Sequence, residues 1–458
     1  MKKILITLLL LFLNTQTKAQ CWKSVFTTGD SSSGIKSDGT LWTWGSSFVN
    51  GQGSNIPIQT GLDNNWQSIS ASNYKVFAIK IDGTLWGWGY DGNGSILPYG
   101  NNLLAQIGTA SNWKSVFAGS GNVVGIKTDG TLWAWGRNDY GQLGDDTNIN
   151  KSAPIQIGVS TNWKSISVGG SHIVAIKNDG TLWAWGRNDL GQLGDGTYVN
   201  KKIPIQIGNE TNWQSISAGS SHTIAIKTNG TLWAWGCNDH RELGVGGIIP
   251  SFTYRNTPLQ VGVANNWQYI YTGGYELTYA IKTDGTLWNW GYGIIARPGY
   301  YGSPAQVGNE TNWKSISLTP EFSYSDGQPH YNVIALKTDG NITSWGNNEF
   351  GQIGDGTYVN KITPVEINCP ITSLNVQQNN ANNNIFIVHP NPVIETLNIE
   401  NISNLNIDKI IITDISGKKV IEKTGNDKQI NVQKLQKGIY IMQIFSEENS
   451  LSMKFLKQ

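Results

Sequence analysis

The sequence predicts an all-β protein: a seven-bladed β-propeller followed by a small C-terminal β-sandwich. Two short markers recur seven times in step, and no unit between them has the apolar period of a helix. Behind the last unit the tryptophans stop, and short alternating strands continue to the end of the chain. We therefore expect a signal peptide at residues 1–19, the propeller at 20–369, an Asn-rich linker at 370–384 and the C-terminal domain at 385–458.

The first residues have the pattern of a secretory signal peptide. Lys2 and Lys3 precede a mostly apolar run at residues 4–13, and small residues follow at the cleavage positions, so the mature chain is expected to begin at Gln20. The apolar run is too short for a stable membrane span, which needs about 20 residues. No later stretch is apolar for long enough, so we expect no transmembrane segment in the mature protein.

The charge balance argues against nucleic acid as a partner. The chain has 33 Lys and Arg against 32 Asp and Glu, without a long basic run. Neutralising phosphates requires a concentrated basic surface, which this composition does not supply. The unusual counts are those of 20 Trp and 54 Gly, and repetition explains both.

The first marker is [Asp/Asn]-Gly-Thr-Leu-Trp-x-Trp-Gly. Its glycine stands at Gly39, Gly83, Gly130, Gly180, Gly230 and Gly285, with a degraded seventh copy at Gly340. The second marker, Trp-[Lys/Gln]-[Ser/Tyr]-[Val/Ile], begins at Trp22, Trp66, Trp113, Trp163, Trp213, Trp267 and Trp313. Units of 44 to 55 residues match a propeller blade in length.

The fourth unit predicts four short strands, at residues 162–168, 172–177, 181–186 and 204–207. Asp179-Gly180, between the second and third strands, predicts a two-residue hairpin with a type I′ turn.

Two tryptophans, Trp183 and Trp185, share one face of the third strand. We expect both to be buried between neighbouring blades, because large aromatic burial is typical of such cores. An exposed sugar-stacking row is the alternative.

These units resemble the regulator of chromosome condensation repeat family, whose members form seven-bladed propellers. The resemblance rests on residues 169–176 and 185–194 and extends over residues 21–369. The family histidine is present as His172 and His222, but the third unit has Asn122 instead, and the Gly-Gln-Leu-Gly element is lost in units one, two and six. The nuclear exchange-factor activity of the family is not expected in a secreted protein, and fold membership does not name a partner.

A disulfide between Cys21 and Cys369 is expected to close the ring. If the last unit continued into the first, the two cysteines would stand three positions apart, which places their Cα atoms within roughly 7 Å. An oxidising compartment would keep the bond. Cys237 then has no partner and is expected to be a tolerated thiol.

The C-terminal domain resembles the type A sorting domain of the bacterial type IX secretion system. The motif residues that carry the resemblance are Pro390, Asn391, Pro392, Gly417, Lys418, Gly438 and Tyr440. The resemblance implies export across the outer membrane by the type IX machinery, removal of this domain, and a product that is released or attached to surface lipopolysaccharide. A purely structural β-sandwich is the alternative.

The ligand is expected at one face of the propeller. Consecutive antiparallel strands place alternate connections at opposite ends, so the first-to-second and third-to-fourth connections share one face, the loop face, and the Asp-Gly turns lie on the other, the turn face. His172 and His222 begin second strands and should lie near the loop face. Irregular residues with large polar or aromatic side chains gather there in units five to seven: Tyr254, Arg255, Arg297, Tyr300, Tyr301, Phe322, Tyr324 and His330. Loop drift without selection is the alternative.

Catalysis has little support in the sequence. Regularly placed aspartates such as Asp139, Asp145 and Asp195 stand in turn contexts, where the carboxylate bonds its own backbone. The five His show no metal-ligand spacing, and no nucleophile or phosphate-loop motif is present, so we expect no metal and no cofactor.

The expected function is a secreted or cell-surface protein that binds an extracellular protein or glycan. The alternative is a polysaccharide-degrading enzyme with its site in the propeller mouth, which convergent carboxylates there would favour.

Overall fold

The computed structural model describes residues 21–46, 53–72, 75–89, 104–246, 253–273, 277–292, 301–319, 331–369, 386–389, 393–401, 406–414, 418–446 and 449–457. The chain divides after Cys369 into two compact units. Within the described ranges, no helix is long and apolar enough to cross a membrane. The predicted signal peptide and linker lie outside these ranges.

The first unit contains seven four-stranded antiparallel sheets, each made of four consecutive strands. The first three blades are β1 (Trp22–Thr27), β2 (Ser31–Lys36), β3 (Leu41–Gly45), β4 (Ser54–Gln59); β5 (Trp66–Ser72), β6 (Lys75–Lys80), β7 (Leu85–Gly89), β8 (Ala105–Gln106); and β9 (Trp113–Ala118), β10 (Asn122–Lys127), β11 (Leu132–Gly136), β12 (Lys151–Gln156).

The remaining blades follow the same order of strands. Blades four and five are β13 (Trp163–Val168), β14 (His172–Lys177), β15 (Leu182–Gly186), β16 (Lys201–Gln206); and β17 (Trp213–Ala218), β18 (His222–Lys227), β19 (Leu232–Gly236), β20 (Arg255–Gln260). Blades six and seven are β21 (Trp267–Gly273), β22 (Leu277–Lys282), β23 (Leu287–Gly291), β24 (Tyr301–Val307); and β25 (Trp313–Leu318), β26 (Asn332–Lys337), β27 (Ile342–Gly346), β28 (Lys361–Ile367).

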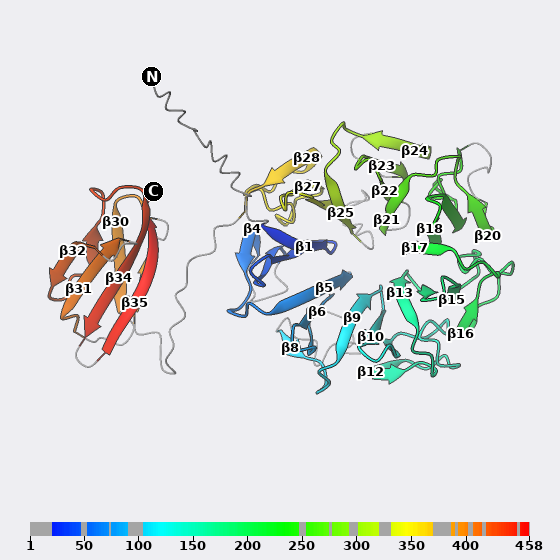
Figure 1. Cartoon of the computed structure of the whole chain (residues 1–458), viewed down its shortest axis with the longest axis horizontal. Coiled ribbons are helices and arrows are strands. Elements are labelled where there is room, and N and C mark those ends of the chain that lie inside the picture. The colour runs from blue at the N-terminus through cyan, green and yellow to red at the C-terminus, as the bar shows by residue number, and fades with distance from the viewer. Residues whose placement is uncertain are drawn as a thin grey trace, which may run out of the picture. The chain divides into compact units, whose positions relative to one another are not determined.

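The blades form a closed ring with the first strand of each blade innermost (Figure 1). Neighbouring innermost strands contact one another around the ring, and β25 contacts β1. At five of these junctions a hydrogen bond joins the turn of one blade to the start of the next: Trp213 N, for example, donates to Gly180 O at 3.2 Å, and Trp22 N donates to Gly340 O at 3.1 Å across the junction of the last blade with the first. The predicted seven-bladed propeller is confirmed.

The Asp-Gly turns differ in detail from the prediction. Gly180 N donates to Lys177 O at 2.9 Å, Lys177 N donates to Thr181 O at 3.1 Å, and Gly180 has φ 80° whereas Asp179 has no positive φ. This is a three-residue loop, a type I turn followed by a left-handed glycine, and the type I′ expectation is wrong. Asp179 Oδ1 accepts hydrogen bonds from the Thr181 N–H and hydroxyl at 3.0 and 2.7 Å, which holds Asp179 in its right-handed conformation.

Tryptophans fill the spaces between blades. In the fourth blade Trp185 is fully buried, and its ring centroid lies 5.9 Å from that of Trp163. Trp183 is half-buried, and Lys177 Nζ lies 3.7 Å from its ring centroid. Burial lowers the pKa of the Lys177 ammonium, against the attraction of Asp179. No tryptophan in the described ranges is exposed, so these indoles form the core expected from the sequence and not a sugar-stacking row.

The Gly-Gln-Leu-Gly element joins each blade that has it to the next blade. Trp235 Nε1 donates to Gln192 O of the preceding blade at 3.0 Å. A Cβ at Gly194 would lie 2.7 Å from that indole nitrogen, so only glycine fits this contact. Where the preceding blade lacks the element, this acceptor is lost: Trp135 Nε1 is buried with no hydrogen-bond partner in the described part of the chain, and Trp345 Nε1 donates to the Tyr279 hydroxyl at 3.4 Å instead.

The predicted disulfide is confirmed. Cys21 and Cys369 are bonded, with their Cα atoms 6.0 Å apart, and join the end of β28 to the start of β1. Trp44 Nε1 and the Ser32 hydroxyl of the first blade also donate to Gln352 O of the last blade, at 3.0 and 2.8 Å. The ring is therefore closed without strand pairing, by side chains, the disulfide and the backbone hydrogen bond from Trp22 to Gly340, because no sheet contains strands from both ends of the propeller.

The second unit is a two-sheet β-sandwich. One sheet contains β29 (Phe386–His389), β30 (Thr396–Asn401) and β33 (Gln429–Asn431); the other contains β31 (Lys409–Asp414), β32 (Lys419–Thr424), β34 (Gly438–Ser446) and β35 (Asn449–Lys457). Both sheets contribute to one apolar core, with Leu397 and Ile430 from the first and Ile412 and Met442 from the second.

The predicted sorting residues are described in part. Tyr440 stacks on Phe455 with ring centroids 5.6 Å apart, and its hydroxyl donates to Gln436 O at 3.0 Å. Gly438 begins β34, and Lys418 N donates to Asp414 Oδ1 at 3.1 Å in the connection between β31 and β32. Pro390, Asn391, Pro392 and Gly417 lie outside the described residues.

Candidate ligand-binding face

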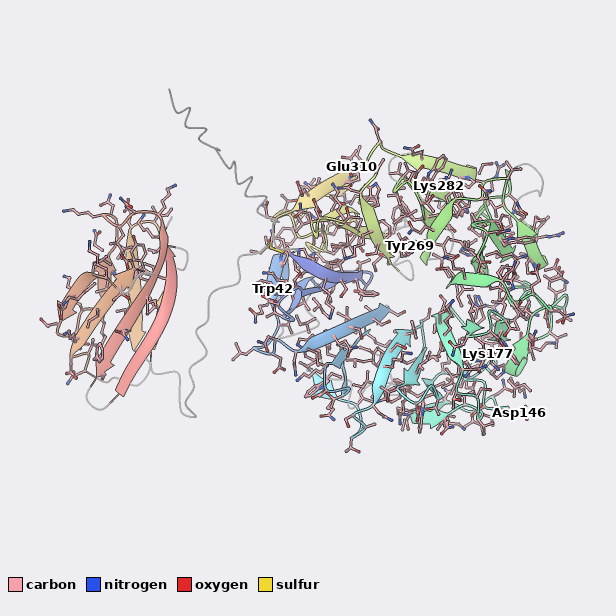
Figure 2. All side chains as sticks on the ribbon, viewed as in Figure 1. Trp42, Asp146, Lys177, Tyr269, Lys282 and Glu310 are labelled. Atoms are coloured by element: carbon pink, nitrogen blue, oxygen red, sulfur yellow. A yellow bond between two sulfur atoms is a disulfide. The ribbon has the colours of Figure 1, made fainter. Side chains whose placement is uncertain are left out.

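A bowl-shaped cavity of about 210 Å³ lies at the loop-face end of the central channel, lined by residues of all seven blades. Its floor comes from the fifth residue of each innermost strand. Three blades supply aromatic rings and four supply hydroxyls at this position: Phe26, Phe117 and Tyr271, then Ser70, Ser167, Ser217 and Ser317. We call these seven residues the floor ring. Tyr269, two residues before Tyr271 on β21, is 43% exposed and lies by the central opening (Figure 2).

The four serines of the floor ring connect neighbouring blades. Each hydroxyl oxygen accepts a hydrogen bond from a backbone N–H of the next blade's innermost strand. The bonds are Ala118 N to Ser70 at 3.1 Å, Ala218 N to Ser167 at 2.9 Å, Thr272 N to Ser217 at 3.0 Å and Thr27 N to Ser317 at 3.1 Å. These bonds fix the diameter of the ring at the level of the floor.

The wall of the bowl consists of glycines and small hydroxyl residues. Gly169 and Gly219 line it, and a Cβ at either position would come within 2.5 Å of the histidine three residues later, His172 or His222. The glycines therefore give the wall a backbone surface. Ser72, also in the wall, is fully buried, and its hydroxyl has no hydrogen-bond partner among the described residues.

The two histidines lie below this wall and not on the surface. His172 is fully buried, and its Nε2 lies 3.0 Å from the Thr223 hydroxyl, which itself donates to Gln192 O at 2.8 Å. Because the Thr223 proton is used on Gln192, His172 Nε2 must donate, which leaves Nδ1 unprotonated. Burial lowers the pKa of His172 and of His222 to about 3. They begin second strands near the loop face as expected, but they are neutral packing residues between blades.

Among the residues that the structure describes, those that line the bowl are uncharged. No cluster of three or more His, Cys, Asp or Glu able to hold a metal occurs in the part of the chain that the structure describes. The aspartates of the third-to-fourth connections have structural partners. Asp195 Oδ1 accepts from Thr197 N at 2.9 Å, and Lys201 Nζ lies 3.1 Å from Oδ2. Burial alone would raise the pKa of Asp195, but these hydrogen bonds hold it below its usual value.

Cys237 is buried and free of disulfides, and it lies beside Glu242 in the third-to-fourth connection of blade five. Burial raises the pKa of the thiol, and the Glu242 carboxyl adds to the effect. Burial also raises the pKa of Glu242. A thiol held protonated in this way is a poor nucleophile, which agrees with a packing role.

Outside the bowl, an arc of side chains follows the loop face from blade three to blade seven. Its members, the rim arc, are Tyr140, Arg187, His240, Tyr292 and Tyr331. The Arg187 guanidinium lies 5.2 Å from the Tyr140 ring centroid, and the His240 and Tyr292 rings are 5.6 Å apart. Burial raises the pKa of Tyr331, with Tyr279 and Tyr292 adding to it. Aromatic and Arg side chains are enriched in interface cores.

The residues that the sequence pointed to lie elsewhere or outside the described ranges. Tyr254 is 41% exposed beside Asp239, whose charge raises the pKa of the phenol. Arg255 begins β20, the outermost strand of its blade, and its Nε is buried without a hydrogen-bond partner. Tyr301 begins the outermost strand β24. Arg297, Tyr300, Phe322, Tyr324 and His330 lie outside the described residues.

Sequence reasoning missed the floor ring and most of the rim arc. The floor ring is visible as the position after each Trp-[Lys/Gln]-[Ser/Tyr]-[Val/Ile] marker, where the residue changes between Phe, Tyr and Ser.

Comparison with known proteins agrees with this architecture. The model of the regulator of chromosome condensation (RCC1) repeat matches residues 129–176 and 179–226, and a second model of the same repeat matches residues 113–142, 163–192 and 213–242. The model of the secretion system C-terminal sorting domain matches residues 387–458. None of the curated proteins matches the chain at the sequence level.

Solved structures share the propeller fold. Prp20p from Saccharomyces cerevisiae is 18% identical, with a TM-score of 0.61 over 76% of this chain and 88% of Prp20p. Yeast RCC1 (Prp20) bound to Kap60 is 17% identical, with a TM-score of 0.61 over 77% of this chain and 86% of the other. Human WBSCR16 is 17% identical, with a TM-score of 0.59 over 69% of this chain and 84% of the other. At these identities the likeness shows the fold alone.

The tail identifies the export route, since a sorting domain of this kind directs proteins through the type IX secretion machinery. The chain is therefore a secreted or cell-surface bacterial protein that carries regulator of chromosome condensation repeats in a seven-bladed propeller and ends in a secretion system C-terminal sorting domain.

Proposed function

We propose that the exported propeller is a binding protein that recognises an extracellular protein or glycan on its loop face. The observation that carries the proposal is the bowl: a pre-formed cavity whose described lining is uncharged and whose floor has four serines bonded to the next blade. A site that needs no rearrangement loses little conformational entropy when its ligand binds. Prp20p, of the same fold, is described with binding properties to Gsp1p and histones.

The enzyme alternative receives less support from the same geometry. A polysaccharide hydrolase needs a pair of carboxyl groups that flank the scissile bond, and the described lining of the bowl offers hydroxyls, backbone groups and aromatic rings. The aspartates of the third-to-fourth connections are held by threonine and lysine partners away from the channel. We therefore propose binding without catalysis.

The binding face is tested by comparing a half-buried position on the loop face with an exposed position on the turn face. Tyr292→Ala removes a member of the rim arc, whereas Val159→Asp changes an exposed residue, 91% accessible, in the connection between β12 and β13 on the turn face. Both variants of the secreted mature protein are measured against glycan arrays and against outer-surface proteins, with thermal unfolding as the folding control. Loss of binding in Tyr292→Ala alone supports the loop face, and loss in Val159→Asp alone contradicts it.

Export is tested separately. We expect a chain truncated before Pro390 to accumulate in the periplasm with its disulfide formed, because the propeller has its own core and does not need the tail to fold. The measurement is cell fractionation with an antibody to the propeller. Unchanged delivery of the truncated chain to the surface or medium would contradict the role of the tail.

A further inference from the structure

The bowl is small and partly open, which limits its occupant to one ring-sized group. Its volume of about 210 Å³ lies below the roughly 300–1,000 Å³ of sites that enclose drug-sized ligands. It lies at the loop-face end of the channel, and the floor ring bounds it on the other side with Phe26, Phe117 and Tyr271, half-buried side chains that also pack between blades. The occupant must therefore enter from the loop face as the end of a molecule.

The chemistry of the lining selects an uncharged occupant. The described residues around the bowl are Phe, Tyr, Ser, Thr, Gly and aliphatic side chains, without a charge. A carboxylate or ammonium placed there would lose its hydration without a charged lining residue to pair with, and the buried ammonium of Lys75 is already bonded to Ser120 O at 2.9 Å. Acidic sugars, phosphates and charged side chains are thus disfavoured.

The mixture of aromatic rings and hydroxyls favours a sugar over an apolar side chain of a protein partner. Three rings that are partly packed between blades line the floor, and their remaining exposed surface can meet the C–H groups of a pyranose, which are positively polarised. The wall adds Ser120 and Ser220, whereas the Ser72 hydroxyl is fully buried and has no hydrogen-bond partner among the described residues. An aliphatic group in the bowl would leave these polar groups unpaired.

We propose that the bowl binds one neutral sugar residue, at the exposed end of an uncharged glycan, with the aromatic members of the floor ring as its stacking surface. This inference rests on the proposed binding function of the loop face and names the ligand class of that site. The serines of the floor ring are already bonded to the next blade, so the stacking surface is rigid before the sugar arrives.

The chain itself supplies conservative variants for the test. Phe117→Ser removes one stacking ring and introduces the residue that four other blades carry at that position, whereas Ser70→Phe adds a ring that fills the bowl and that two other blades carry there. Lys164→Gln is the control: Lys164 is exposed near the turn-face end of β13, outside the bowl, and three blades have Gln at this position. Lys164→Gln should keep the wild-type melting temperature, whereas Ser70→Phe loses the hydrogen bond from Ala118 N and Phe117→Ser loses ring packing, so both should melt at a lower temperature while remaining folded at the temperature of the assay.

The probe is an array of neutral glycans with terminal glucose, galactose, mannose or N-acetylhexosamine, together with acidic glycans, and positives are titrated by calorimetry. We expect the mature protein to bind at least one neutral terminal sugar, Phe117→Ser to weaken that binding about tenfold or more, Ser70→Phe to abolish it and Lys164→Gln to leave it unchanged.

Three results would overturn the inference. They are binding to none of the neutral glycans, binding to acidic glycans only, and equal affinity of Ser70→Phe and wild type. If a protein partner is captured instead and its binding is lost in Tyr292→Ala, the sugar site is wrong while the proposed function of the loop face stands. If the mature protein binds neither a glycan nor a protein, both proposals fail.

Discussion

The two buried histidines predict a specific loss of stability in mild acid. In the unfolded chain an imidazole titrates near pH 6.5, whereas burial lowers the pKa of His172 and of His222 to about 3 in the folded protein. Between these values the unfolded state binds more protons than the folded state. The free energy of unfolding is therefore at its full value above about pH 6.5 and falls as the pH falls toward 3.

The size of the effect follows from the two pKa values. From pH 7 to pH 5, each histidine should reduce the free energy of unfolding by about 2 kcal/mol, and both together by about 4 kcal/mol. The structural cause is that Nδ1 of each ring is buried with no acceptor among the described residues, so the second proton has nowhere to bond. At pH 5 the carboxylates, which titrate near pH 4 when unfolded, still contribute little to the change.

The test replaces both histidines by asparagine, the residue found at the equivalent Asn122 and Asn332. Denaturant unfolding of the mature protein is followed by tryptophan fluorescence at pH 7 and pH 5. We expect the wild type to lose about 4 kcal/mol more than the His172→Asn/His222→Asn variant between the two pH values. If the variant loses as much stability as the wild type, the histidines do not titrate as the burial of their rings requires.

Two further predictions concern ring closure and blade contacts. Replacing Cys21 and Cys369 by serine should lower the free energy of unfolding by up to about 5 kcal/mol, because the bond closes a loop with a sequence separation of 348. Thermal unfolding measures this loss, and the variant should melt at the same temperature as the reduced wild type. Gly194→Ala should destabilise by about 1–3 kcal/mol more than Gly196→Ala. Both glycines have positive φ, but only at Gly194 would a Cβ meet Trp235, at 2.7 Å; equal melting temperatures of the two variants would contradict this contact.

Sequence reasoning predicted the ring because the repeated markers define equivalent positions in every blade. The same equivalence placed Cys21 next to Cys369, since a continuous ring makes the last unit precede the first. Burial of the tryptophans was predictable for a similar reason: each blade has two neighbours, so both faces of its sheet are covered.

The details that sequence reasoning missed depend on contacts between chain segments. The turn at Gly180 follows from the Asp179 side chain and from the next blade, because a Cβ there would lie 2.0 Å from Thr211 O. The floor ring forms only when seven distant strands meet around one axis, so Phe26, Phe117 and Tyr271 look like isolated substitutions in the sequence. Irregular sequence instead drew attention to Tyr254 and Arg255, which belong to the outer edge of a blade.

The way the ring is closed has a consequence for how such a protein can be rearranged. Every blade is built from one uninterrupted stretch of chain, and the first and last blades share no sheet. A circular permutant that links residue 369 to residue 21 and opens the chain at the connection between β16 and β17 would keep all seven sheets intact. Whole units can likewise be exchanged as cassettes, provided that the segments of Cys21 and Cys369 are kept, because their disulfide joins the last blade to the first.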